Sequence, residues 1–146
     1  MKVVVAIASL FALVSASAAT AADISYTGNW PVKLSHDVFL TTNGYTGHGP
    51  NSTHCLALTD DGSVGCPHSG FAVLDNNINS SGQFAVIGHT ILIYIYTLGS
   101  GQEPASLVFS TDARNGIIGK RAAFDNVQGG TSFDAADATF GQKNGC

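Results

Sequence analysis

The sequence predicts an all-β fold, a single antiparallel up-and-down β-barrel of about eight strands, with a β-sandwich as the second choice. Apolar and polar residues alternate in short segments, and no stretch keeps the 3.6-residue period of an amphipathic helix. The chain has 17 glycines and 4 prolines. Turn residues of this kind separate the alternating segments roughly every 10–15 positions, a spacing typical of antiparallel barrels and sandwiches.

Four strands are expected in the first half of the domain. Segment 28–34 places a Trp, a Val and a Leu on one face, and segment 54–59 places two leucines on one face before an Asp-Asp-Gly turn. Segment 70–74 is short and apolar and begins at a Gly. A polar loop rich in Asn and Ser leads to segment 83–87, which Gly88 ends.

Four more strands are expected in the second half. Segment 89–98 is the strongest, and a turn with two Gly and a Pro follows it. Segment 105–110 places a Leu and a Phe on one face before an Asn-Gly turn. Segments 117–124 and 131–140 complete the barrel, with a Gly-Gly pair between them.

The core is expected to collect one apolar face from each strand. Its predicted members are Trp30, Leu34, Leu56, Leu58, Phe71, Val73, Phe84, Val86, Ile91, Ile93, Leu107, Phe109, Phe124, Phe133 and Phe140.

Segment Ile91–Tyr96 is apolar on both faces. Three isoleucines face one way, and Leu92, Tyr94 and Tyr96 face the other. A central strand with half-buried tyrosines explains this pattern, because tyrosine tolerates partial exposure. The alternative is that the tyrosine face lines a ligand cavity or a subunit interface, and self-association through this segment would follow from the latter.

The N-terminus has the features of a secretion signal. Lys2 precedes an apolar run of 12 residues, 3–14, which is shorter than the roughly 20 residues of a membrane-spanning helix, and Ala19-Thr20-Ala21 fits a signal-peptidase site. We therefore expect a signal peptide over 1–21, a single domain over 22–146, and a secreted or periplasmic location.

The charge of the mature chain argues against two classes of partner. It would carry five basic and ten acidic residues, a net charge of −5, without a basic patch. Binding to nucleic acid or, after signal cleavage, to an anionic membrane is therefore not expected.

Three cysteines in an exported chain leave one without an intramolecular partner. We favour a Cys55–Cys146 disulfide, because closing about 90 residues should stabilise by roughly 4–5 kcal/mol against about 3 for the short loop to Cys66. A terminal cysteine also needs such a tie to be ordered. Pairing of Cys55 with Cys66 stays open, as does a free Cys66.

No motif selects a catalytic or metal site. The five histidines lack the spacing of a metal-binding pair, and no Gly-x-Ser-x-Gly, Cys-x-x-Cys or phosphate-binding loop is present. No cofactor is expected.

Two resemblances add to this interpretation. Gly28-Asn29-Trp30 resembles the Gly-x-Trp start of lipocalin- and avidin-like (calycin) barrels, in which the Trp closes one barrel end. The segments 55–65, 82–88 and 133–146 resemble small secreted bacterial proteins of unassigned function. The resemblances imply export and a compact β fold, and they imply no activity.

The function expected from the sequence is that of an exported binding protein without catalytic activity, which recognises a small ligand or a partner protein. Trp30, Tyr94 and Tyr96 are the predicted ligand-binding residues, provided that they reach one hydrophobic cavity. A filled barrel with a flat apolar outer face would favour a protein interface instead. The alternatives are a secreted hydrolase with a site dispersed over loops, in which a His meets an Asp or Ser, and a self-associating structural protein.

Overall fold

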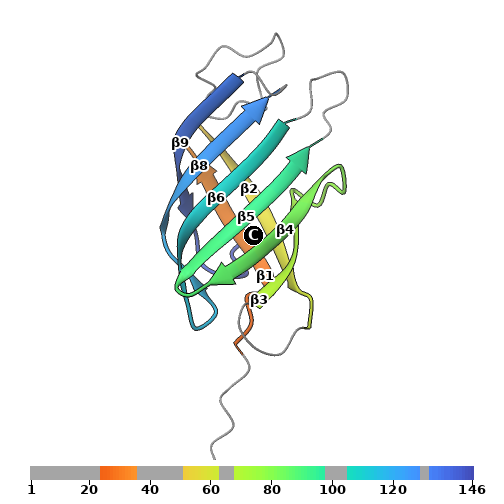
Figure 1. Ribbon diagram of the computed structural model, residues 1–146, viewed down its shortest axis with the longest axis vertical. Coiled ribbons are helices and arrows are strands. Elements are labelled where there is room, and N and C mark those ends of the chain that lie inside the picture. The colour runs from red at the N-terminus through yellow and green to blue at the C-terminus, as the bar shows by residue number, and fades with distance from the viewer. Residues whose placement is uncertain (1–23, 36–50, 63–67, 98–104, 129–131) are drawn as a thin grey trace, which may run out of the picture.

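The computed structural model describes residues 24–35, 51–62, 68–97, 105–128 and 132–146. All regular structure in these ranges is β (Figure 1). The strands are β1 (Gly28–Leu34), β2 (Ser52–Asp60), β3 (His68–Leu74), β4 (Ser80–Ile87), β5 (Thr90–Thr97), β6 (Ala105–Arg114), β7 (Ile117–Ile118), β8 (Arg121–Gln128) and β9 (Ser132–Phe140). The predicted signal peptide, 1–21, lies outside the described residues, and so does Cys66.

Eight of these strands close into an antiparallel barrel, which confirms the predicted fold class. Each strand pairs with the next in the ring, and the ring closes where β1 pairs with β9. The two-residue β7 lies outside the ring and pairs with the last residues of β6. In Figure 1 the barrel axis is upright, and β2, β4, β6 and β9 all end at its lower end.

Two predicted elements differ in detail from the structure. The predicted strand 117–124 is divided into β7 and β8, because Gly119 and Lys120 are left out of the register in which both strands pair with β6. The Asp-Asp-Gly sequence does not form a tight hairpin, since Asp60 of β2 pairs with Gly70 of β3. The connection between these strands is therefore longer than predicted.

The interior of the barrel is filled by large apolar side chains. Alternate residues of every strand turn inward, as the period of a strand requires. Phe109 packs against Phe124 and Phe140, with ring centroids 5.0 and 6.0 Å apart. The buried residues include Tyr26, Trp30, Leu34, Leu56, Leu58, Phe84, Val86, Ile91, Ile93, Ile95, Leu107, Phe109, Phe124 and Phe140.

The predicted facing of β3 is wrong. Phe71 is 58% exposed and Val73 is half-buried on the outer face, whereas Ala72 and Leu74 point inward. A shift of one residue moves every side chain of a strand to the other face. Phe84 accounts for the observed choice, because it stands opposite Gly70 and its ring fills the space where a side chain on Gly70 would lie. The structure does not describe the side chain of Phe133, another predicted core residue.

The C-terminal residues extend the pairing of β1 beyond the end of β9. The Gly141 N–H donates to the Pro31 carbonyl at 2.7 Å, and the Asn144 N–H donates to the Asn29 carbonyl at 2.5 Å. Pro31 has no N–H to pair along this edge, which suits a position where the regular ladder has ended. The tail therefore completes the seam that closes the barrel.

A disulfide joins Cys55 on β2 to Cys146, with Cα atoms 5.9 Å apart and 91 positions between them in the sequence. This confirms the pairing favoured from the sequence. The C-terminal tail borders β1 on one side, and β2 borders it on the other. The disulfide therefore joins the two neighbours of β1. No helix in the described residues has the length and apolar character needed to cross a membrane.

Removal of this disulfide should destabilise the barrel. The double variant Cys55→Ser, Cys146→Ser is expected to lose about 2–5 kcal/mol of unfolding free energy, because its unfolded chain is no longer constrained. Urea denaturation followed by Trp30 fluorescence measures the loss. Dithiothreitol should lower the stability of the wild-type protein to that of the variant and leave the variant unchanged. Equal stability of the oxidised wild type and the variant would contradict the proposed tie.

Candidate functional site

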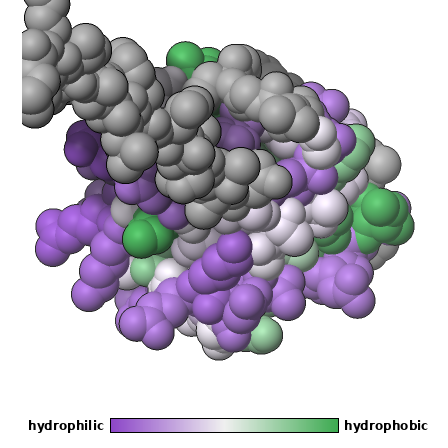
Figure 2. Space-filling model, turned by 90° about the horizontal axis from the view of Figure 1, so that it is seen from below, coloured by the Kyte–Doolittle hydropathy of each residue, from purple (hydrophilic) through white to green (hydrophobic). Residues whose placement is uncertain are grey.

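The lower end of the barrel gathers residues from widely separated parts of the chain. In an up-and-down barrel every second connection lies at the same end, so the β4–β5 and β6–β7 turns are neighbours there. Residues 24–27, which precede β1, lie across the same end. Figure 2 shows this end from below, where hydrophilic residues cover much of the visible coloured surface and hydrophobic residues appear in several separate places, most extensively at the right.

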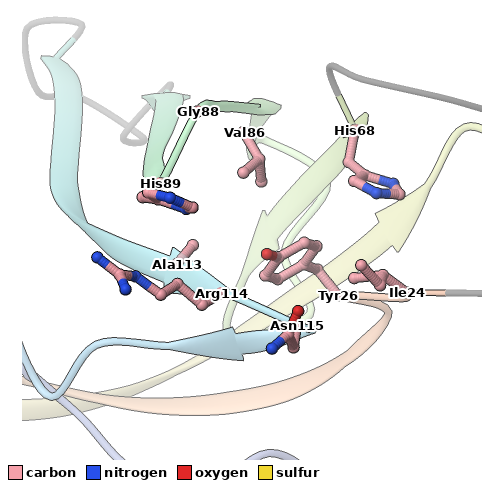
Figure 3. Close-up of a pocket in the computed structure, with 9 residues that line it drawn as sticks. All are labelled: Ile24, Tyr26, His68, Val86, Gly88, His89, Ala113, Arg114 and Asn115. Atoms are coloured by element: carbon pink, nitrogen blue, oxygen red, sulfur yellow. The ribbon is translucent and has the colours of Figure 1, made fainter.

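A pocket of about 340 Å³ opens at this end (Figure 3). Its residues come from the N-terminal segment, from β3 and β4, and from the two turns. They are Ile24, Tyr26, His68, Val86, Gly88, His89, Ala113, Arg114 and Asn115. In Figure 3, His68 and His89 stand on opposite sides of the pocket, with Tyr26 between them.

Tyr26 is held in place from several sides. Its N–H points to both carboxylate oxygens of Asp60, at 3.2 and 3.3 Å, and Asp60 also accepts a hydrogen bond from the Ser25 hydroxyl. The Tyr26 carbonyl accepts a hydrogen bond from the Trp30 indole N–H at 3.1 Å. Its ring packs edge-on against His68, with centroids 6.0 Å apart. The wall of the pocket that Tyr26 forms is therefore fixed to β1, β2 and β3.

The two turns that border the pocket are built from left-handed residues. Asn115 and Gly116 have φ of 53° and 75°, and Gly88 has φ of 62°. Asn and Gly adopt this region at the lowest cost, which is why Asn-Gly pairs suit two-residue turns. The His89 carbonyl accepts a hydrogen bond from the Ala113 N–H at 2.7 Å, so the two turns are also joined to each other.

The chemistry of the pocket is that of an apolar surface with hydrogen-bond donors at its edge. Ile24, Val86 and Ala113 supply apolar wall, and Arg114 and Asn115 line the edge, where the Arg114 guanidinium extends toward the side of His89 (Figure 3). Among the lining residues that the structure describes there is no Asp or Glu. Such a site suits an anion that carries an apolar body, because a guanidinium pairs with a carboxylate in two parallel hydrogen bonds.

A second feature is the outer face of β3, β4, β5 and β6, which we call the apolar face. The outward residues described on these strands, from Ser69 of β3 to Ser110 of β6, carry no charge. Large side chains are exposed there, namely Phe71, Ile87, Leu92, Tyr94 and Tyr96. The outer face of β8 and β9, in contrast, carries Arg121, Asp125 and Asp137.

The structure does not bring the three predicted ligand-binding residues together. Trp30 is buried inside the barrel at 2% exposure, whereas Tyr94 and Tyr96 lie on the apolar face at 47% and 40%. The isoleucines of β5 take the inward positions, so the tyrosines must point outward. The Tyr94 hydroxyl pairs with the Ser106 hydroxyl at 3.0 Å on the neighbouring strand. A cavity shared by Trp30 and the two tyrosines is therefore not formed.

Sequence reasoning missed His68, His89 and Arg114 as pocket residues. They are far apart in the chain and match no motif. The alternation of turns in an up-and-down barrel was the usable signal, because it assigns the end of β2, the start of β3, and residues 88–89 and 114–116 to one end. Among the described residues no group of His, Cys, Asp and Glu side chains could hold a metal ion.

Comparison with known proteins adds no relative. No protein-family model matches the chain, and neither a curated protein nor a solved structure matches it.

The hydrogen bond between Trp30 and Tyr26 should contribute to stability. Trp30→Phe removes the buried hydrogen bond that the indole N–H donates to the Tyr26 carbonyl, so we expect a loss of about 1–3 kcal/mol of unfolding free energy. Urea denaturation followed by far-UV circular dichroism measures it. The matched control is Tyr94→Phe, which removes an exposed hydroxyl and should change stability by less than about 0.5 kcal/mol. Equal losses in the two variants would argue against the role of this hydrogen bond.

Proposed function

We propose that the protein is an exported binding protein whose lower-end pocket takes a small ligand with a carboxylate and a compact apolar body. The observation that carries this proposal is the described part of the lining, which combines apolar wall with Arg114, two histidines and Asn115 and holds no acid. The volume of about 340 Å³ falls within the range of small-molecule sites.

The packing of the barrel supports a site at its end rather than along its axis. Side chains such as Leu107, Phe109 and Ile93 are almost fully buried in the middle of the barrel and fill it. A ligand in the lower-end pocket would leave this core intact. The pocket walls are also held by hydrogen bonds before any ligand arrives, which lowers the entropic cost of binding.

Titration with benzoate tests the proposed pocket. We expect benzoate to bind with a Kd of about 1 mM or lower and benzyl alcohol, which lacks the charge, to bind at least tenfold more weakly. Arg114→Gln should weaken benzoate binding at least tenfold, about 1.4 kcal/mol. Isothermal titration calorimetry gives the affinities, and Trp30 fluorescence, whose indole is bonded to the Tyr26 carbonyl, gives a second readout.

Arg121→Gln is the matched control, because it removes the same charge from an exposed position outside the pocket. Its affinity for benzoate should equal that of the wild type. Absence of benzoate binding at 10 mM (about ten times the expected Kd), or equal weakening by both variants, would overturn the proposal.

The apolar face favours a second function, self-association with another copy of this chain. The mature chain carries a net charge of −5, so two copies meet with the least close contact between like charges where both surfaces are uncharged. The apolar face is uncharged and exposes two tyrosines and a leucine from one strand. The same face of a second copy is uncharged and apolar as well, so the two can pair without burying an unpaired charge.

Light scattering coupled to size-exclusion chromatography tests this pairing. We expect the wild-type mature protein to dimerise with a Kd of about 100 µM, a binding free energy of about −5.5 kcal/mol, and Tyr94→Lys to be monomeric at the same concentration. Asn29→Lys, at an exposed position on β1, introduces the same charge away from the apolar face and should remain dimeric. A wild-type protein that stays monomeric at high concentration would rule out self-association through the apolar face.

A further inference from the structure

Three side chains at the upper end of the barrel form a hydrogen-bonded chain of Ser, His and Asp. The Ser52 hydroxyl lies 2.9 Å from Nε2 of His54, and Nδ1 of His54 lies 2.5 Å from Oδ2 of Asp75. These contacts lie at the opposite end of the barrel from the lower-end pocket. They match the arrangement that the hydrolase alternative predicts.

The β structure places each member of the chain. Ser52 and His54 are two positions apart on β2, so they share the side of the strand that Leu56 continues into the core. Leu74, the last residue of β3, pairs with Leu56, which brings Asp75 next to Cys55. Asp75 adopts φ of 52°, a left-handed conformation that Asp tolerates in turns.

The carboxylate of Asp75 is fixed by backbone groups. Its Oδ1 accepts the Cys55 N–H at 2.8 Å, and the Asp75 N–H donates to the Cys55 carbonyl at 2.7 Å. Cys55 is itself fixed by its disulfide to Cys146. The other carboxylate oxygen is thereby held toward His54. A carboxylate can only accept at this contact, so the Nδ1 proton points to Asp75, and a neutral imidazole then presents the Nε2 lone pair to the Ser52 hydroxyl.

We infer that Ser52 and His54 are a nucleophile and its general base for the hydrolysis of small carboxylic esters, with Asp75 as a positioning residue. The order of contacts, nucleophile to base to orienting carboxylate, is the geometry by which such sites are recognised on unrelated folds. The His54 side chain retains 12% exposure and the Asp75 side chain 46%, so the chain of contacts lies near the surface.

The reaction balances with water as the co-substrate. Ser52 Oγ forms a bond to the ester carbonyl carbon while its proton passes to Nε2 of His54. The bond from that carbon to the alcohol oxygen breaks, and His54 returns the proton to the departing alcohol. Water then attacks the acyl group on Ser52, one of its protons passes through His54 to Ser52 Oγ, and the carboxylic acid leaves.

Hydrolysis of p-nitrophenyl acetate by the mature protein tests the inference. Ser52→Ala should reduce the rate at least 100-fold, and His54→Gln should do the same. Asp75→Asn should lower kcat while KM stays within about twofold, because its carboxylate holds the base and does not touch the ester. A merely structural role for Asp75 would not separate kcat from KM in this way. Circular dichroism confirms that each variant is folded.

Covalent labelling separates nucleophilic catalysis from hydrolysis by surface histidines. Diisopropyl fluorophosphate should modify the wild-type protein once, at Ser52, as peptide mass spectrometry would show, and should leave Ser52→Ala unmodified. Ser69→Ala is the matched control, because Ser69 bonds to the Asp61 carboxylate at 2.5 Å. This variant should hydrolyse the ester and react with the label like the wild type. Hydrolysis that survives Ser52→Ala, or a label on another residue, would overturn the inference.

Discussion

The structure depends on closing a ring of strands so that each backbone edge finds a partner. The weakest part of that ring is the β1–β9 seam, where three residue pairs are in register in the described residues, against five or more at the other seams of the barrel. The C-terminal tail lengthens this seam through its bonds to Asn29 and Pro31, and the Cys55–Cys146 disulfide fastens the tail to β2. An unclosed ring would expose two strand edges, which are sites of aggregation. The tail and the disulfide therefore protect the fold at the place where it would open.

Closure also decides where function can reside. Once alternate residues of eight strands point inward, the interior is filled by side chains such as Phe109 and Phe124, with exposures of 1% and 2%. Surface for recognition then remains on the outer face and at the two ends. The outer face is divided, because the apolar face is uncharged while β8 and β9 carry Arg121, Asp125 and Asp137. The same constraint that builds the core thus distributes the candidate sites over three separate surfaces.

The sequence predicted the fold class and the facing of β5 because both depend on period and turn residues. It did not predict the facing of β3, since 70–74 is apolar at alternate positions on either choice. The deciding contact is Phe84 over Gly70, a pairing of a large with a small residue on neighbouring strands. A contact between strands cannot be deduced from one strand alone. The predicted ligand residues illustrate the same limit, because Trp30 and Tyr94 each suit a binding site and yet lie on opposite sides of the barrel wall.

The candidate sites depend on register more than on motif, and this explains why a scan for motifs misses them. Ser52 and His54 are near neighbours in the chain, but Asp75 joins them through the pairing of Leu56 with Leu74 and through its own left-handed backbone. At the other end, His89 and Arg114 meet because two turns alternate to the same side of the ring. In a barrel of short strands, side chains can meet when their residues lie at the same level along the barrel axis. Register, once known, therefore identifies such groups where spacing in the sequence cannot.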